Sequence, residues 1–227
     1  MATPSPAIPR SLFALSIFYG GMVCIAGVLG NKQVSLGPIS AIGTWLGVGP
    51  LAVEAGIFAF LLLVAVSSAV AELHGRAIAN RLVLFGFVPL LVSTGLSLLV
   101  LVLPSSPSME PDRVQAFALM MGSTWRIWIG GILAYGVSQT LNVTIFSALK
   151  QGGGRLMWLR AAIASVLSQI ADTLIFVTVA FAGIFPIGEL LVGQMLAKVT
   201  LSIVLVPPLI YGAVAIGRAL DGKPPHA

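Results

Sequence analysis

Six long apolar stretches limit what this chain can fold into. Each contains about 20 residues, the length that a helix needs to cross a hydrocarbon core of about 30 Å. They lie at residues 12–30, 51–71, 82–103, 127–149, 159–181 and 190–216. Only 8% of the 227 residues are charged, whereas soluble domains average about 25%. The sequence therefore predicts an all-α membrane protein, a six-transmembrane-helix bundle.

The connecting segments are short, so we expect a single transmembrane domain over residues 1–227 with no added soluble domain. Residues 114–123 are apolar but too few to span a bilayer, and we expect an interfacial helix there. Pro207 and Pro208 are expected to break the sixth stretch, because proline lacks the backbone N–H of a helix. No Ala-x-Ala cleavage site follows the first stretch, which we interpret as a retained span.

The basic residues are unevenly distributed between the two sides of the predicted bundle. Lys32 and Arg113 lie on one side. The other side, which holds both chain ends, carries eight basic residues: Arg10, Arg76, Arg81, Lys150, Arg155, Arg160, Arg218 and Lys223. Positive charge favours the cytoplasmic side, so both termini are predicted to be cytoplasmic. The net charge of +5 is dispersed without a dense patch, which argues against nucleic acid as a partner.

One polar phrase occurs twice, thirty positions apart, inside apolar stretches. Its copies are Ser138-Gln139-x-x-Asn142-x-x-x-Phe146 and Ser168-Gln169-x-x-Asp172-x-x-x-Phe176. Residues at i and i+3 share one face of a helix, so each copy points two polar side chains the same way. In lipid such a face is either a polar lock between helices or a binding surface. On two antiparallel neighbours, the copies would lie around a local pseudo-twofold axis, as in many transporters.

Two charged residues fall near the predicted midplane of the membrane. Asp172 lies on the fifth stretch and Lys198 at matching depth on the sixth. Either charge alone would cost a few kcal/mol there, so we expect them to be partners, directly or through a ligand. A purely structural pair remains an alternative.

Other polar residues have less certain positions. Arg126, between Trp125 and Trp128, is either an interfacial anchor or a cavity residue. Glu54 and Glu189 lie near the outer ends of spans and are expected to be solvated. His74 is expected in a loop.

An enzymatic function is poorly supported. The two histidines are far apart, no H-E-x-x-H motif occurs, and no convincing catalytic dyad can be assembled. No metal site, phosphate loop or cofactor is predicted. The single cysteine, Cys24, excludes an intrachain disulfide. A binding or transport protein needs only a polar pocket at depth, which this sequence supplies.

At these positions the chain resembles the queuosine precursor transporters, also called the vitamin uptake transporter family. The resemblance covers most of the chain. Its carriers are Asn31-Lys32-x-Val34, Glu72-Leu73-His74-Gly75, Arg126-Ile127, Ala134-Tyr135 with the first copy of the polar phrase, Trp158-Leu159-Arg160, the second copy extended by Thr173, Ala180-Phe181, and Lys198 followed by Pro208-x-x-Tyr211. The chain departs from the family pattern at Ser68 and Asn142, where members usually carry Asp.

The resemblance implies a multi-pass protein of the bacterial inner membrane that imports 7-deazaguanine bases such as preQ0 and preQ1, or queuine, into the cytoplasm for tRNA modification. It also implies a bundle like the substrate-binding subunits of energy-coupling-factor transporters. The alternative function is such a binding subunit for a vitamin-like molecule, which would need a separate ATPase module. The expected partners are a small purine-like base and membrane lipid, and a homo-oligomer is compatible with the sequence.

The chemistry of such a base fits the polar residues. A guanine-like edge places two donors side by side, for which the Asp172 carboxylate is a two-point acceptor. Gln139, Gln169 or Lys198 would donate to a carbonyl oxygen, and Trp125 is a further candidate for an aromatic wall. The predicted substrate-binding set is Asp172, Gln169, Gln139, Asn142, Lys198, Arg126, Phe146, Phe176 and Tyr135.

Overall fold

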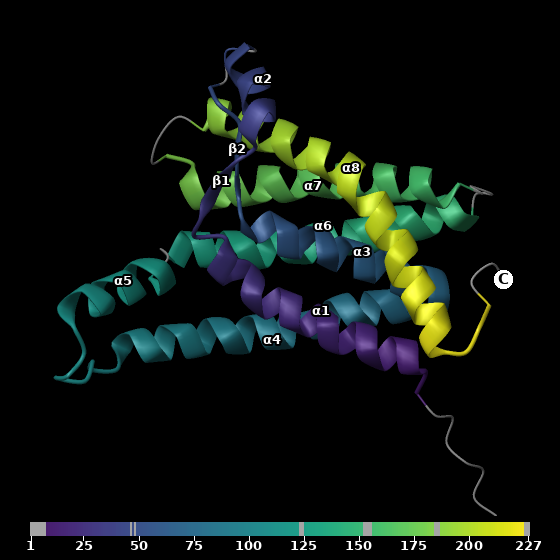
Figure 1. Cartoon of the computed structure of the whole chain (residues 1–227), viewed down its shortest axis with the longest axis horizontal. Helices are drawn as coiled ribbons and strands as arrows, with labels where there is room; N and C mark the ends of the chain where they lie inside the picture. The colour runs from purple at the N-terminus through teal and green to yellow at the C-terminus, as the bar shows by residue number, and fades with distance from the viewer. Residues whose placement is uncertain are drawn as a thin grey trace, which may run out of the picture.

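Six helices of the computed structural model are long and apolar enough to cross a membrane. The structure describes residues 8–45, 47, 49–122, 125–151, 156–183 and 187–224. The six helices are α1 (Arg10–Leu29), α3 (Gly56–His74), α4 (Arg76–Val102), α6 (Trp125–Gln151), α7 (Met157–Phe181) and α8 (Gly188–Leu220). They run alongside one another as a bundle (Figure 1). The prediction of a six-helix membrane protein is confirmed.

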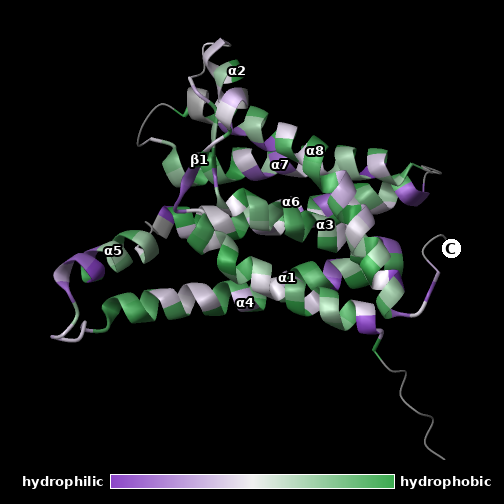
Figure 2. Cartoon of the chain, in the orientation of Figure 1, coloured by the Kyte–Doolittle hydropathy of each residue, from purple (hydrophilic) through white to green (hydrophobic). Residues whose placement is uncertain are grey.

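α3 is the central helix of the bundle. It contacts α1, α4, α6 and α8, and most of its residues from Ile57 to Ala71 are buried. α4 is the opposite case, with only four buried residues in its whole length. Apolar residues cover much of α1 and α4 (Figure 2), and Leu84 and Phe85 are more than 60% exposed. Such an apolar outer surface is suited to contact with lipid tails.

A small hairpin precedes α3, at a place where the sequence predicted the start of a span. β1 (Gln33–Ser35) pairs antiparallel with β2 (Ala52–Glu54), and the 3₁₀-helix η1 (Gly37–Ile39) and short helix α2 (Ser40–Trp45) lie between them. Together they lie at the end of the bundle where α1 ends and α3 begins, and α2 projects to the side beyond α8 (Figure 1). We call this end of the bundle the hairpin end. The prediction that residues 51–55 belong to the second span is therefore wrong. Their apolar character is satisfied by packing instead, since Val53 is fully buried within β2.

The prediction that Pro207 and Pro208 break the last span is also wrong. α8 continues through both prolines to Leu220, and the helix changes direction along its length (Figure 1). Each proline removes one backbone hydrogen bond without ending the helix, because neighbouring packing and a local bend compensate for the loss. The short helix expected near residues 114–123 is present as α5 (Pro111–Met121).

The two chain ends are tied together at the opposite end of the bundle, which we call the terminal end. The Ser11 hydroxyl donates to Asp221 Oδ2 at 2.7 Å, and the Ser11 N–H donates to Asp221 Oδ1 at 2.9 Å. His74 Nε2 lies 2.8 Å from the same hydroxyl. The prediction that His74 lies in a loop is wrong, because His74 is the last residue of α3. This contact joins the start of α1, the end of α3 and the end of α8.

The Ser11 contact predicts a pH-dependent stability difference. Hydrogen bonds from the Ser11 hydroxyl and N–H hold the pKa of Asp221 below its ordinary value of 3.8. A lowered carboxyl pKa stabilises the fold above pH 4 or so, and that contribution disappears as Asp221 is protonated at lower pH. We expect Ser11→Ala to lower the apparent Tm of the detergent-solubilised protein by a few degrees at pH 7, and by less at about pH 3.

Ser16→Ala, on the same helix, is the matched control. Ser16 makes no side-chain hydrogen bond in the described structure, so its substitution should change Tm little. An equal effect of Ser11→Ala at both pH values would contradict the role given to the Asp221 carboxylate.

Candidate functional site

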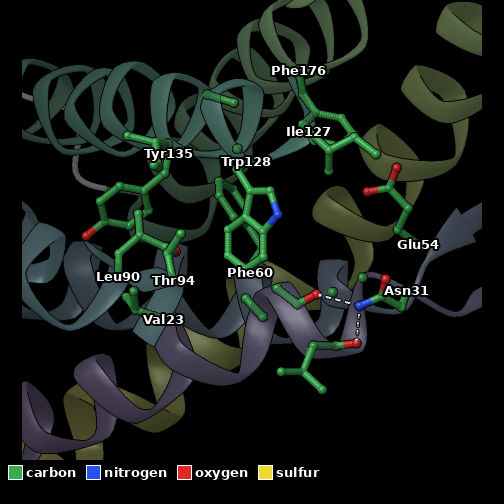
Figure 3. A pocket seen from close by; sticks show the side chains of 18 of the residues that line it. Val23, Asn31, Glu54, Phe60, Leu90, Thr94, Ile127, Trp128, Tyr135 and Phe176 are labelled. Atoms are coloured by element: carbon green, nitrogen blue, oxygen red, sulfur yellow. Dashed lines mark hydrogen bonds between the residues drawn. The ribbon is translucent and has the colours of Figure 1, made fainter. Parts of the chain in front are cut away.

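A cavity of about 410 Å³ occupies the half of the bundle nearer the hairpin end, within the usual size range of small-molecule sites. Its walls come from α1, the hairpin, α3, α4, α5, α6, α7 and α8, and its polar lining includes Asn31, Glu54, Thr94, Tyr135, Asp172 and Lys198. Figure 3 shows Glu54 and Asn31 on one side, Leu90 and Thr94 on the other, and Trp128 between them.

The wall of this cavity contains the predicted buried ion pair. Lys198 Nζ lies 3.4 Å from Asp172 Oδ2, and both residues are more than 90% buried. Ser138, from the first copy of the polar phrase, donates to Asp172 Oδ1 at 3.4 Å. The expectation that Asp172 and Lys198 are partners is confirmed. Their contacts are long compared with the 2.7–2.9 Å typical of charge-assisted hydrogen bonds, so the carboxylate is not tightly engaged.

Close packing of α6 against α7 brings these groups together. A Cβ added at Gly130 would lie 3.4 Å from the Phe176 carbonyl oxygen, in van der Waals contact, so the two helix backbones lie close together there. Phe176 itself lines the cavity, with its ring 5.8 Å from Lys198 Nζ and edge-on to Phe181. Tyr135 contributes a second aromatic wall, and its hydroxyl donates to the Val83 carbonyl at 3.0 Å. Two predicted aromatic residues therefore border the same space as the ion pair.

The other predicted binding residues lie elsewhere. Gln139 and Asn142 are buried against α3, and Gln169 is fully buried with no side-chain partner among the described residues. Arg126 donates to the backbone carbonyls of Val179 at 3.0 Å and Ala182 at 2.9 Å, so it caps the end of α7. Phe146 packs under the guanidinium of Arg160, 4.9 Å from its ring centroid. None of these five residues lines the cavity. The side chain of Trp125 is outside the described part.

Several cavity residues were not predicted. Glu54 was expected to be solvated, but it is half-buried, lines the cavity and accepts a hydrogen bond from Gln194 Nε2 at 3.2 Å. The expectation was wrong because the hairpin that carries Glu54 was not foreseen. Trp128 also lines the cavity. The only feature of the sequence that pointed to this residue was its position close to Arg126 and Trp125. The side chain of Glu189 lies outside the described residues. Within the described ranges, no group of three His, Cys, Asp or Glu side chains is placed to hold a metal ion.

Comparison with known proteins identifies the family. The profile described as "Putative vitamin uptake transporter" matches residues 54–212, which include the ion pair and most of the cavity wall. The chain belongs to this family. A "Probable queuosine precursor transporter" of Bacillus subtilis (strain 168) is 33% identical over 141 residues, or 60% of this chain and 61% of that protein. The chain thus matches less than two thirds of that relative's length. No solved structure matches the chain.

The two departures from the family pattern touch one another. Asn142 Nδ2 donates to Ser68 Oγ at 3.0 Å and lies 3.3 Å from Ser67 Oγ. Ser67 in turn donates to Gln139 Oε1 at 3.2 Å. Ser68 and Asn142 therefore form a neutral hydrogen-bonded pair between α3 and α6. The first copy of the polar phrase locks α6 to α3, whereas the second reaches the cavity through Asp172.

The buried ion pair predicts a characteristic stability pattern. Removing one partner leaves a buried charge without compensation, at a cost of about 3–5 kcal/mol, whereas replacing both with apolar or neutral groups costs much less. We expect Asp172→Asn and Lys198→Met each to lower the free energy of unfolding strongly. The double variant should lose less free energy of unfolding than the sum of the two single losses. Reversible unfolding in detergent measures all three.

Arg113→Ala is the control. Arg113 pairs with Glu110 at 3.2 Å on α5, with side chains 77% and 74% exposed, so its loss should cost no more than about 1 kcal/mol. Additive effects at positions 172 and 198 would show that the two charges are energetically independent.

Proposed function

We propose that this protein imports a queuosine precursor, a 7-deazaguanine base such as preQ0 or preQ1, or queuine, across a bacterial inner membrane. The similarity to a relative described as a queuosine precursor transporter supports the substrate class. The family assigns a transport function to the chain rather than an enzymatic one.

The observation that carries this proposal is the Asp172 carboxylate at the cavity wall. Its two oxygens have one long contact each, to Ser138 and to Lys198. A guanine-like edge presents two donors side by side and would bind both oxygens with shorter bonds. Lys198 would then be free to donate to a carbonyl oxygen on the base. Phe176, Tyr135 and Trp128 supply flat apolar surfaces for the ring.

The charge distribution and the position of the cavity support the proposed direction of transport. Among the described residues, seven basic residues lie toward the terminal end (Arg10, Arg76, Arg81, Lys150, Arg160, Arg218 and Lys223) and three toward the hairpin end (Lys32, Arg113 and Arg126). This asymmetry supports assigning the terminal end to the cytoplasm. The cavity lies toward the hairpin end, the external side in this orientation. Below it the bundle is closed by the buried polar lock and by the Arg160–Glu72 pair at 3.1 Å. This arrangement corresponds to a state that receives substrate from outside. We also propose that the bundle is similar to the substrate-binding subunits of energy-coupling-factor transporters.

Substrate binding supplies the first test. Asp172→Asn should abolish stabilisation of the purified protein by preQ1 in a thermal-shift assay, because an amide offers one acceptor and turns an NH2 toward the second donor. Asn142→Ala should only weaken it, since Asn142 lies outside the cavity lining and its loss removes ordinary hydrogen bonds of about 1 kcal/mol each. Size-exclusion profiles control for folding. A well-folded Asp172→Asn protein with unchanged preQ1 affinity would remove Asp172 from recognition.

The second test concerns the orientation of the protein in the membrane and its ability to transport substrate without an ATPase module. In a Cys24→Ala background, a membrane-impermeant maleimide should label Lys32→Cys in intact cells but label Lys223→Cys only after lysis. In liposomes containing this protein alone, labelled preQ1 should accumulate or equilibrate across the membrane. Saturable binding without flux would favour the alternative of a binding subunit that requires an ATPase module.

A further inference from the structure

The charges that line the cavity do not cancel. Among the described residues, its charged lining consists of Asp172, Lys198 and Glu54. Asp172 and Lys198 neutralise each other at 3.4 Å. Glu54 has no ion pair within 4 Å in the described structure, and its hydrogen bond comes from the neutral amide of Gln194. The cavity therefore carries one uncompensated negative charge.

The fold holds Glu54 firmly at this place. It pairs with Gln33 across the hairpin, and its neighbour Val53 is fully buried. Because successive side chains alternate along a strand, burial of Val53 on one face directs Glu54 to the other. α3 begins at Gly56, two residues after Glu54. A Cβ added at Gly56 would lie 2.7 Å from the Ala26 carbonyl oxygen of α1, so the two backbones approach more closely than a larger residue would allow. The hairpin is thus anchored against α1 immediately beside Glu54.

Nearby cations do not satisfy Glu54. Lys32 precedes β1, and its carbonyl accepts a hydrogen bond from the Ala55 N–H at 2.7 Å. Its side chain is nevertheless exposed and does not line the cavity. Lys198 is engaged by Asp172. A cation that enters the cavity would therefore meet a carboxylate without a positively charged partner.

Glu54 and the ion pair are held by residues on neighbouring turns of α8. Glu54 contacts Gln194, and Asp172 contacts Lys198, and these two contact residues lie one turn apart on α8. The step of four residues from position 194 to position 198 corresponds to about 6 Å along the helix axis, at about 1.5 Å each. The ring of Trp128 lies between the two sides of the cavity (Figure 3), where it offers an aromatic face to a ligand cation.

We propose that Glu54 is a specificity-determining residue that binds a protonated alkylamine on the substrate while Asp172 binds the opposite, guanine-like edge. The inference rests on the proposed function and narrows it: the preferred substrate is a deazaguanine that carries an amine, since alkylamines are protonated at neutral pH. An uncharged base of the same shape leaves Glu54 uncompensated in a partly desolvated site and binds less tightly.

A matched pair of ligands tests this role. preQ1 carries an aminomethyl group where preQ0 carries a nitrile, so the two differ in the group assigned to Glu54. Calorimetric titration of the purified protein should show a preference for preQ1 of about tenfold to a hundredfold, the range expected for one hydrogen bond to a charged group. Glu54→Gln should reduce this preference to about twofold or less by weakening preQ1 binding and leaving preQ0 binding nearly unchanged.

Two further variants complete the design. Glu110→Gln removes an exposed carboxylate on α5, outside the cavity, and should retain the full preference for preQ1. Glu54→Asp keeps the charge and should retain a preference for preQ1, so it separates charge from side-chain shape. If Glu54→Gln is poorly folded, the wild-type preference and the Glu54→Asp result still decide.

The outcomes separate this inference from the proposed function. Binding of both bases by the wild-type protein with no preference for preQ1, or an unchanged preference in Glu54→Gln, would overturn the role of Glu54 and leave deazaguanine transport intact. Binding of neither base to the well-folded wild-type protein would overturn the proposed function and this inference together.

Discussion

The buried Asp172–Lys198 pair is the constraint on which the rest of the site depends. Each charge would be costly alone inside an apolar bundle, so α7 and α8 must keep a fixed register to hold the two side chains 3.4 Å apart. The contact is nevertheless long and lies at a cavity wall. A buried pair that is costly to break but loosely engaged is well suited to exchange one partner for a ligand without exposing either charge to lipid.

The repeated polar phrase has separated into two roles. Gln139 and Asn142 bind the serines of α3 and lock two helices together, whereas Asp172 reaches the cavity and the last helix. Interhelical locking and ligand binding were both compatible with the pattern, and the structure divides them between the copies. The contact of Asn142 with Ser68 is between two neutral groups, so this buried position carries no charge that needs a partner.

The cavity joins a rigid half to a more exposed half. α7 and α8 supply the ion pair at its wall, and α7 packs extensively against both α6 and α8. The opposite wall comes from α1, from the outer part of α4 and from α5, a helix with no buried residue. Helices with little buried surface open at lower cost than a packed core. The side of the cavity formed by α4, α5 and the hairpin would therefore open with less disturbance of the ion pair than the side formed by α7 and α8.

The sequence by itself determined the number of spans, since a bilayer demands about 20 apolar residues per helix and this requirement is local. It also determined the Asp172–Lys198 pair, because matched depth and the cost of isolated charges leave few alternatives. Only the tertiary structure decided the rest. The hairpin pairs residues about 20 positions apart, from Gln33 to Glu54. Gly37-Pro38 and Gly49-Pro50 mark turns beside the two strands, but such local signals do not say which strands pair. The position of Glu54 at the cavity, the contact of Arg126 with the end of α7, and the continuation of α8 through two prolines all depend on tertiary structure. Long-range packing determines where a polar side chain lies and which group binds a backbone carbonyl that has lost its helical partner.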